Sequence, residues 1–198
     1  MEAKPRARQQ ITWDEFRELR QRMRHPNPAM ALAANLGWYA GLRVTEMTKL
    51  TWAHCGTLDS VTRRLTLPAE ITKNHNERTL PIALPLAKHL IVHRQWQGSF
   101  IQQPRDDENI ITRDYDKRPL TPRAIQKAFA RAAKRAGLGR VTPHTLRHTF
   151  ATNLLKVSTT RLVQLALGHR SITTTELYTH PTIDEIELAM AKAFTEET

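Results

Sequence analysis

The segment from Thr142 to His180 constrains this chain more than any other stretch. Thr142 is a typical N-cap and Pro143 is favoured at the first helical position, so the sequence predicts a helix that begins at residue 143. His144 and Arg147 are three residues apart and therefore share one face of that helix. The free backbone N–H groups and the helix dipole at this end favour an anion. The segment predicts a phosphate-binding helix turn.

The same segment also offers a nucleophile. His169 follows a glycine, and Tyr178 lies nine residues later. Two imidazoles, a guanidinium and a phenol around a phosphate indicate phosphoryl transfer to tyrosine. Because a free tyrosine has a pKa near ~10, Tyr178 must lose its proton as it attacks. His144 or His169 could accept that proton, or nearby cations could stabilise the phenolate.

Positive charge is concentrated around this segment. The net charge is +11, and no acidic residue lies between Asp116 and Glu176, where 12 lysines and arginines stand. The rest of the chain holds 18 basic and 19 acidic residues, so the whole excess lies in that window. A solvated basic face is one interpretation. Segregation this complete favours a polyanionic partner, namely nucleic acid.

The composition narrows the class of protein. With 198 residues, 40% of them hydrophobic, the chain is long enough for one domain with a sizeable core. The single cysteine, Cys55, excludes an internal disulfide and is typical of a reducing cytoplasm. No apolar run approaches the roughly 20 residues of a membrane helix, so we expect a cytoplasmic, nucleoid-associated protein without a membrane partner.

Local patterns predict an α+β, mainly α-helical fold with a small antiparallel β-hairpin. Alternating residues predict strands at 64–67 and 78–82, with Lys73 near the tip of the hairpin. A loop is expected over 97–118, with at most a short strand at 110–111. Capping boxes, prolines and apolar spacing predict helices at about 12–24, 29–40, 86–96, 121–136 and 182–194, a short helix within 41–52 and a helix that begins at residue 143.

Three further residues are candidates for chemistry. Arg43 and Glu46 are three apart, which indicates either a surface ion pair worth well under ~1 kcal/mol or an arginine oriented by a carboxylate. Lys73 is either solvated or the acid that protonates a leaving oxygen, since a lysine with a pKa near ~10.4 is protonated at neutral pH. Arg43 and Arg147 would each stabilise a phosphorane-like transition state by about 3–4 kcal/mol. No residues have metal-ligand spacing, so we expect neither a metal nor another cofactor.

The segments GLRVTEMTKLTW, TPHTLRHTFATNLL and LGHRSITTTELYTH together resemble the tyrosine recombinase (phage integrase) family, over about Thr12 to His180. The resemblance implies a catalytic domain over 11–181, with a basic arm at 1–10. It implies that Glu46 supports the first arginine and that Lys73 is the general acid. It further implies that Tyr178 forms a 3′-phosphotyrosyl link and that the scissile phosphate is surrounded by Arg43, Lys73, His144, Arg147 and His169.

The resemblance also implies a function and partners. It implies a site-specific recombinase (an integrase, excisionase or invertase) that acts without metal or ATP on double-stranded DNA. We expect a homotetramer on DNA, with accessory DNA-bending or directionality factors. The basic helix from Thr121 would enter the major groove, and its contact candidates are Arg123, Lys127 and Arg131. Residues 182–198 would dock onto a neighbouring protomer, or else pack in cis.

The sequence departs from the family pattern at three places. Val157 and His54 stand where members often have glycine and aspartate. The first ten residues cannot encode the helical core-binding domain that most members carry. The chain is therefore either a naturally short recombinase, like the fimbrial-switch invertases, or an excised catalytic domain.

Two other functions remain open from the sequence. One is a catalytically silent DNA-binding module of the same fold, although such a module would not need all six chemical residues. The other is a type IB topoisomerase, which shares the chemistry but relaxes supercoils without strand exchange.

Overall fold

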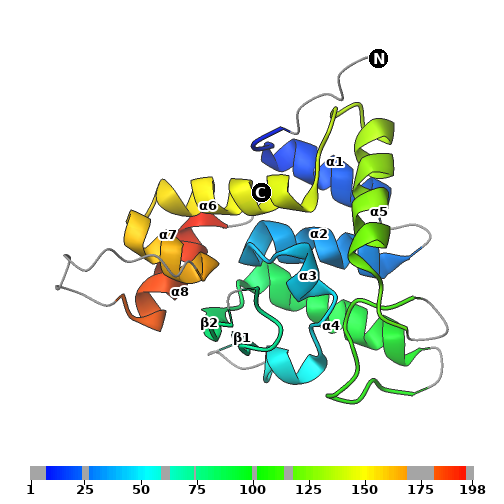
Figure 1. Cartoon of the computed structure of the whole chain (residues 1–198), viewed down its shortest axis with the longest axis horizontal. Coiled ribbons are helices and arrows are strands. Elements are labelled where there is room, and N and C mark those ends of the chain that lie inside the picture. Colours follow the sequence, from blue (N-terminus) through cyan, green and yellow to red (C-terminus); the bar gives the residue numbers. More distant parts are fainter. Residues whose placement is uncertain are drawn as a thin grey trace.

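Helices form most of the structure, and a two-stranded antiparallel sheet lies at one side of them (Figure 1). The computed structural model describes residues 8–23, 27–58, 63–73, 75–99, 102–113, 118–168 and 181–194. Its elements are α1 (Trp13–Met23), α2 (Pro28–Ala40), α3 (Val44–Met47), the 3₁₀ turn η1 (Trp52–Cys55), β1 (Arg64–Leu67), β2 (Arg78–Pro81), α4 (Leu84–Gly98), α5 (Pro122–Arg135), α6 (Pro143–Leu155), α7 (Thr160–Leu167) and α8 (Ile183–Ala193). The predicted α+β, mainly helical fold class is confirmed.

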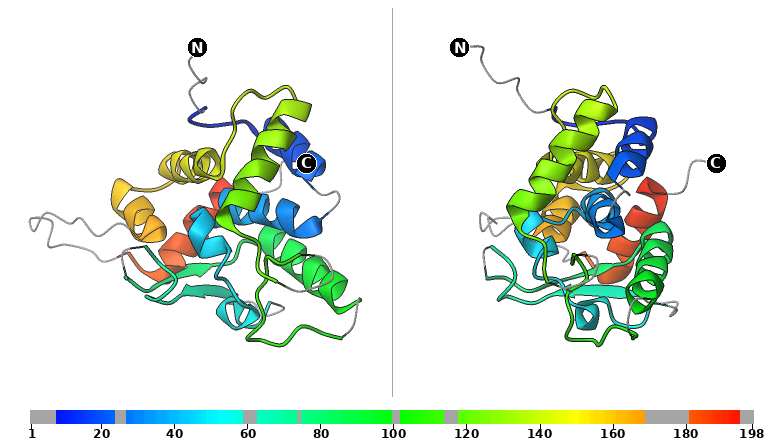
Figure 2. Two further views of the ribbon diagram at one scale, coloured as in Figure 1. Left: turned by 45° about the vertical axis from the view of Figure 1, so that its right-hand side comes forward. Right: turned by 90° about the vertical axis from the view of Figure 1, so that its right-hand side faces the viewer.

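Helix α2 is the centre of the core. It packs against α1, α4, α5 and α6, and ten of its residues are buried. Its small residues allow close approach: a Cβ added at Gly37 would lie 3.1 Å from the Cβ of Leu146 in α6. Each large apolar side chain buried here contributes about 1.5–3 kcal/mol. In both views of Figure 2, α1 and α6 lie on one side of α2 and the hairpin lies on the other.

Gly41 ends α2 and turns the chain toward α3. It has φ +61°, a conformation that costs residues with a side chain more than glycine. A Cβ at this position would also lie 2.5 Å from Cδ1 of Phe150 in α6, which is too close for any side chain. The glycine therefore permits both the turn and the close packing of α6. Arg43 follows two residues after this turn.

The two strands and α8 form the other side of the core. The hairpin pairs Arg64 with Pro81 and Leu67 with Arg78. Helix α8 packs against β2 and α6, and Arg64 forms an ion pair with its Glu187 at 2.7 Å. Phe194, directly after α8, is buried and stacks on Phe150 with ring centroids 5.3 Å apart. The apolar seam of α8 is therefore covered by its own chain in this structure.

Element boundaries differ from the sequence-based expectation at three main places. The short helix expected within 41–52 ends at Met47, and Trp52–Cys55 forms the separate 3₁₀ turn η1. Helix α4 begins at Leu84, before Pro85, because proline is tolerated in a first helical turn. The short strand expected at 110–111 is absent: these buried isoleucines lie between two isolated bridges, Thr51 with Asn109 and Thr112 with Pro119. Neither bridge extends, so this segment is a buried loop.

Residues 1–7 of the predicted basic arm lie outside the described residues, whereas the backbone N–H of Arg8 donates to the Arg140 carbonyl at 3.0 Å. Within the described ranges, no helix combines the length and apolar character needed to cross a bilayer.

Candidate active site

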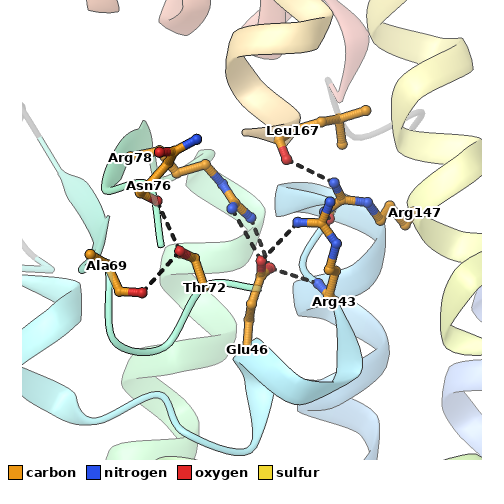
Figure 3. A network of polar contacts seen from close by, with 9 residues as sticks. Arg43, Glu46, Ala69, Thr72, Asn76, Arg78, Arg147 and Leu167 are labelled. Carbon is orange, nitrogen blue, oxygen red and sulfur yellow. Dashed lines mark hydrogen bonds and ion pairs between the residues drawn. The ribbon is translucent and has the colours of Figure 1, made fainter. Parts of the chain in front are cut away.

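A fully buried carboxylate is the structural centre of the site (Figure 3). The Glu46 side chain is 0% exposed. Its Oε1 accepts hydrogen bonds from Nη1 of Arg43 and Nη1 of Arg78, each at 3.1 Å. Its Oε2 accepts from the backbone N–H of Arg43 and from Nη2 of Arg78, each at 2.8 Å. Burial raises the pKa of Glu46, but the hydrogen bonds and charge of Arg78, with the Arg43 N–H, lower it below its usual value overall.

This geometry decides between the two interpretations of the Arg43–Glu46 pair. Arg43 is the residue before α3, and Glu46 is its third residue, so the carboxylate also caps the helix through the Arg43 N–H. The Arg43 side chain remains 23% exposed, whereas Glu46 is enclosed. The pair is therefore an arginine oriented from behind by a carboxylate, and not a surface ion pair.

Arg147 lies beside Arg43, in the first turns of α6 (Figure 3). Its Nη1 donates to the Gly41 carbonyl at 2.6 Å and its Nη2 donates to the Leu167 carbonyl at 2.7 Å. Burial, followed by the positive charge of Arg43, lowers the pKa of Arg147 to about 9, and Glu46 opposes this shift. Arg147 therefore remains protonated at neutral pH and is fixed by two carbonyl groups.

The three guanidinium groups outnumber the carboxylate. Among the residues that the structure describes, Arg43, Arg78 and Arg147 carry three positive charges against the one negative charge of Glu46, a charge excess of about two. A buried charge excess of this kind is unfavourable without a counter-ion. An anionic group that contacts the exposed part of Arg43 would supply it. The cluster fits a phosphodiester, which arginine binds in a planar, bidentate manner.

His144 stands in the first turn of α6, exposed and next to His148, with ring centroids 4.6 Å apart. Partial burial, then the charges of His148, Arg147 and Arg43, lowers the pKa of His144 below its usual value of 6.5. With Arg147 and His148 it lines a pocket of about 370 Å³ between α6 and α7. His144 is therefore mainly neutral at pH 7 and available to accept a proton.

We expect the pKa of His144 to lie below 6.5 and to rise when His148 is replaced by glutamine. Nearby positive charge disfavours the protonated imidazole, so removing one such group raises the pKa. A titration followed by NMR of the imidazole Cε1–H signals measures both values. A midpoint at or above 6.5 in the wild-type protein, or no shift in His148→Gln, would contradict this expectation.

Lys73 follows the buried Thr72 in the turn between the strands and is exposed. Oγ1 of Thr72 donates to the Ala69 carbonyl at 3.1 Å or the Asn76 carbonyl at 3.0 Å, which closes the turn (Figure 3). The predicted position of Lys73 on the hairpin is therefore confirmed. Its role as a general acid stays a prediction.

His169 and Tyr178 lie outside the described residues. The chain is described up to Gly168, which ends α7 with φ +67°. The backbone carbonyl of Leu167, one residue earlier, accepts a hydrogen bond from Arg147. Helix α7 therefore ends at the arginine cluster, directly before His169.

Arg78 is a residue of the site that the sequence-based reasoning missed. Its side chain is 6% exposed and forms a bidentate ion pair with Glu46. The strand pattern contained a sign of it, since Arg78 and Leu80 are two apart and so share one face of β2. Leu80 is fully buried. A charged residue on a buried strand face requires a charged partner.

The basic side chains of α5 lie on its outer face. Arg123, Lys127 and Arg131 are exposed. The opposite face, which packs against α1, buries Ile125, Ala128, Phe129, Ala132 and Ala133. Figure 2 (right) shows α5 and α3 on one side of the molecule and α4 and α8 on the other, with the hairpin running across beneath them. The helix that carries the candidate DNA-contact residues is therefore on the same side as α3.

Known proteins are similar to this chain in sequence and in fold. The chain is 33% identical over 144 residues to tyrosine recombinase XerD of Listeria innocua, covering 72% of this chain and 46% of XerD. It is 35% identical over 150 residues to tyrosine recombinase XerC of Haemophilus ducreyi, covering 73% of this chain and 45% of XerC. The chain thus spans about half the length of the curated relatives it matches.

Solved structures of other proteins have a similar fold. XerA recombinase superposes with a TM-score of 0.68 at 25% identity, over 93% of this chain and 64% of XerA. The lambda integrase catalytic core, at 22% identity, superposes with a TM-score of 0.65 over 84% of this chain and 95% of that core, and shows the fold alone. Residues 9–185 match the sequence profile of the phage integrase family. This chain belongs to the phage integrase family.

Proposed function

We propose that this chain is the catalytic domain of a site-specific DNA recombinase that cleaves and rejoins DNA through a 3′-phosphotyrosyl intermediate at Tyr178. The observation that carries the proposal is the charge excess of the arginine cluster, in which Arg43 and Arg147 are fixed by Glu46 and by two backbone carbonyls. Membership of the phage integrase family supports it. Relatives named as tyrosine recombinases support the same reaction class.

In the proposed reaction, the phenolic oxygen of Tyr178 attacks the phosphorus and the bond from phosphorus to the 5′-oxygen breaks. The phenolic proton passes to His144 or His169, and Lys73 gives a proton to the leaving 5′-oxygen. Arg43 and Arg147 stabilise the extra negative charge on the non-bridging oxygens. A 5′-hydroxyl from a second strand then attacks the phosphotyrosine and reseals the backbone. We propose that neither metal nor ATP takes part.

A covalent selection tests this function without knowledge of the DNA site. The protein is incubated with a library of nicked duplexes with randomised sequence, in which the short cleaved fragment diffuses away and traps the intermediate. DNA that stays attached to protein in SDS is recovered and sequenced. The proposal predicts one enriched site and an adduct that forms in EDTA without ATP. No adduct would indicate a silent DNA-binding module, and relaxation of plasmid lacking the site would indicate a topoisomerase.

We propose that the outer face of α5 binds duplex DNA through Arg123, Lys127 and Arg131, which are exposed on it. Replacing all three with glutamine is expected to lower the slope of log affinity against log salt by about 2.7, since each lost phosphate contact removes roughly 0.9. Lys88→Gln, at an exposed position on α4, is the control and should leave the slope unchanged. Fluorescence anisotropy at several salt concentrations measures it. An unchanged slope in the triple variant would disprove the assignment.

We propose that the active assembly is a homotetramer on DNA and that residues 182–198 dock on a neighbouring protomer there. The support is that one solved lambda integrase structure is a tetramer bound to a Holliday junction. Ile186, Met190 and Phe194 are buried within this chain here, so docking in trans requires α8 to exchange that packing for a neighbour's. Deleting 182–198 is expected to abolish tetramers and strand exchange. Sedimentation on junction DNA measures the first and a two-site plasmid assay the second. If both persisted in the folded truncated protein, α8 would pack only in cis.

A further inference from the structure

We propose that Arg78 is a positioning residue of the recombinase reaction: through Glu46 it fixes the guanidinium of Arg43, and it holds the end of α7 beside the arginine cluster. This inference rests on the proposed function. Arg78 itself is buried, and both of its terminal nitrogens donate to Glu46. It acts on the phosphate only through other residues.

The hydrogen bonds are arranged so that Arg78 and Arg43 share both oxygens of one carboxylate. Oε1 of Glu46 accepts one N–H from each arginine, and so does Oε2. The planar fork of Arg78 fixes the plane of the carboxylate, because both of its terminal nitrogens donate to it. Held in that plane, the carboxylate accepts hydrogen bonds from the backbone N–H and the Nη1 of Arg43. Without Arg78, the carboxylate would keep only its bonds to Arg43, so the plane of the carboxylate and the direction of the Arg43 guanidinium would be less fixed.

Arg78 also contacts the end of α7. A Cβ added at Gly168 would lie 2.9 Å from Nη1 and 3.1 Å from Cδ of Arg78, so the glycine backbone lies directly against the guanidinium. Gly168 precedes His169 in the chain. Arg78 is also the first residue of β2, five residues after Lys73. One side chain therefore connects the Arg43 turn, the Lys73 hairpin and the segment that leads to His169 (Figure 3).

Stability alone does not account for a guanidinium at this position. A buried ion pair is often no more stabilising than apolar residues of the same volume. Arg78 also adds a third positive group near Arg43 and Arg147, which helps to lower the pKa of Arg147. Its Nε has no hydrogen-bond partner within the described part of the chain. A guanidinium here offers no general gain in folding free energy over an apolar side chain, but it increases the positive potential where a phosphate would bind.

The test compares Arg78→Gln and Arg78→Lys with the wild-type protein. The selected nicked duplex gives the single-turnover cleavage rate at saturating protein, and anisotropy gives the DNA dissociation constant. Arg94→Gln is the control, since Arg94 is also in an ion pair, with Asp106 at 2.9 Å, but lies on α4. All rates are measured at a temperature where circular dichroism shows each variant to be folded.

We expect Arg78→Gln to slow cleavage by roughly 10- to 100-fold. Residues that orient a metal ligand in metalloenzymes affect activity on the same scale. The dissociation constant should stay unchanged, and Arg78→Lys should recover part of the rate by retaining the charge. Glu46→Gln combined with Arg78→Gln should be no slower than the worse single variant, because both changes remove the same support. A cleavage rate of Arg78→Gln equal to that of the wild-type protein would overturn the proposal. Rate losses of the two single variants that multiply in the double variant would also overturn it.

A second measurement does not depend on activity. In protein labelled with ¹⁵N-arginine, a fixed side chain gives a sharp, slowly exchanging Nε–H signal. We expect such a signal from Arg43 in the wild-type protein and in Arg94→Gln, and its broadening or loss in Arg78→Gln. An unchanged Arg43 signal in Arg78→Gln would overturn the positioning role even if cleavage occurs. A wild-type protein that forms no adduct would instead refute the proposed function, while the Arg43 signal still decides the role of Arg78.

Discussion

Replacing Tyr178 with phenylalanine is expected to abolish the SDS-stable protein–DNA adduct. The change removes one oxygen atom, the proposed nucleophile, and leaves the ring. Loss of a catalytic nucleophile lowers rates by roughly 10⁴- to 10⁶-fold, so no adduct should be detected within hours. DNA affinity should not change, because Arg43, Arg147 and the basic face of α5 remain. Gel electrophoresis in SDS and anisotropy measure the two quantities.

Tyr39→Phe is the matched control for this experiment. Tyr39 is buried in the core against Phe16, with ring centroids 6.0 Å apart, and lies in α2. It should retain adduct formation. An adduct that survives in Tyr178→Phe but disappears in Tyr39→Phe would show that Tyr39, and not Tyr178, is needed for the covalent bond. That result would refute the proposed reaction.

Replacing Glu46 with glutamine is the second change with a large expected effect. It leaves Arg43, Arg78 and Arg147 buried or half-buried with no carboxylate between them. Breaking a buried ion pair by removing one partner costs about 3–5 kcal/mol of folding free energy. We expect the free energy of unfolding at pH 7 to fall by this amount, measured by urea denaturation. Cleavage should also slow, because Arg43 loses both its orientation and its capped turn.

Glu46→Gln should also change how the free energy of unfolding depends on pH. The pKa of Glu46 is lowered in the folded state, so the ionised carboxylate stabilises the protein above the usual pKa of 4.5, and this stability is lost as the pH falls through the folded-state pKa. Glu46→Gln should lack this acid-dependent loss. Glu46→Asp, which keeps the charge, should lie between the two proteins. A Glu46→Gln protein as stable as the wild type at pH 7 would show that the carboxylate is not a structural requirement.

Local sequence patterns predicted most elements because their causes are local. The capping box of Thr12 and Glu15 is present, with the Thr12 N–H donating to Oε2 of Glu15 at 2.9 Å. Thr142 caps α6 through a bond from the Thr145 N–H at 3.2 Å. Gly41 ends α2 at residue 40, the end predicted for that helix. These contacts join residues within a few positions, so composition and spacing are sufficient to find them.

The architecture of the site depends on contacts that spacing does not encode. Arg78 and Glu46 are 32 positions apart, and their ion pair exists only once the hairpin packs beside α3. The burial of Glu46, which turns an apparent surface pair into an oriented one, has the same origin. The sequence therefore predicted which residue types the site needs, whereas the packing determined how Arg43 is held.

The most direct test of the proposed reaction is to map the covalent bond between protein and DNA. The adduct formed in EDTA on the selected nicked duplex is digested with protease and nuclease, and the linked peptide is sequenced by mass spectrometry. We expect a nucleotide attached through its 3′-phosphate to Tyr178, with a free 5′-hydroxyl on the released strand. Attachment to any other residue, or through a 5′-phosphate, would contradict it.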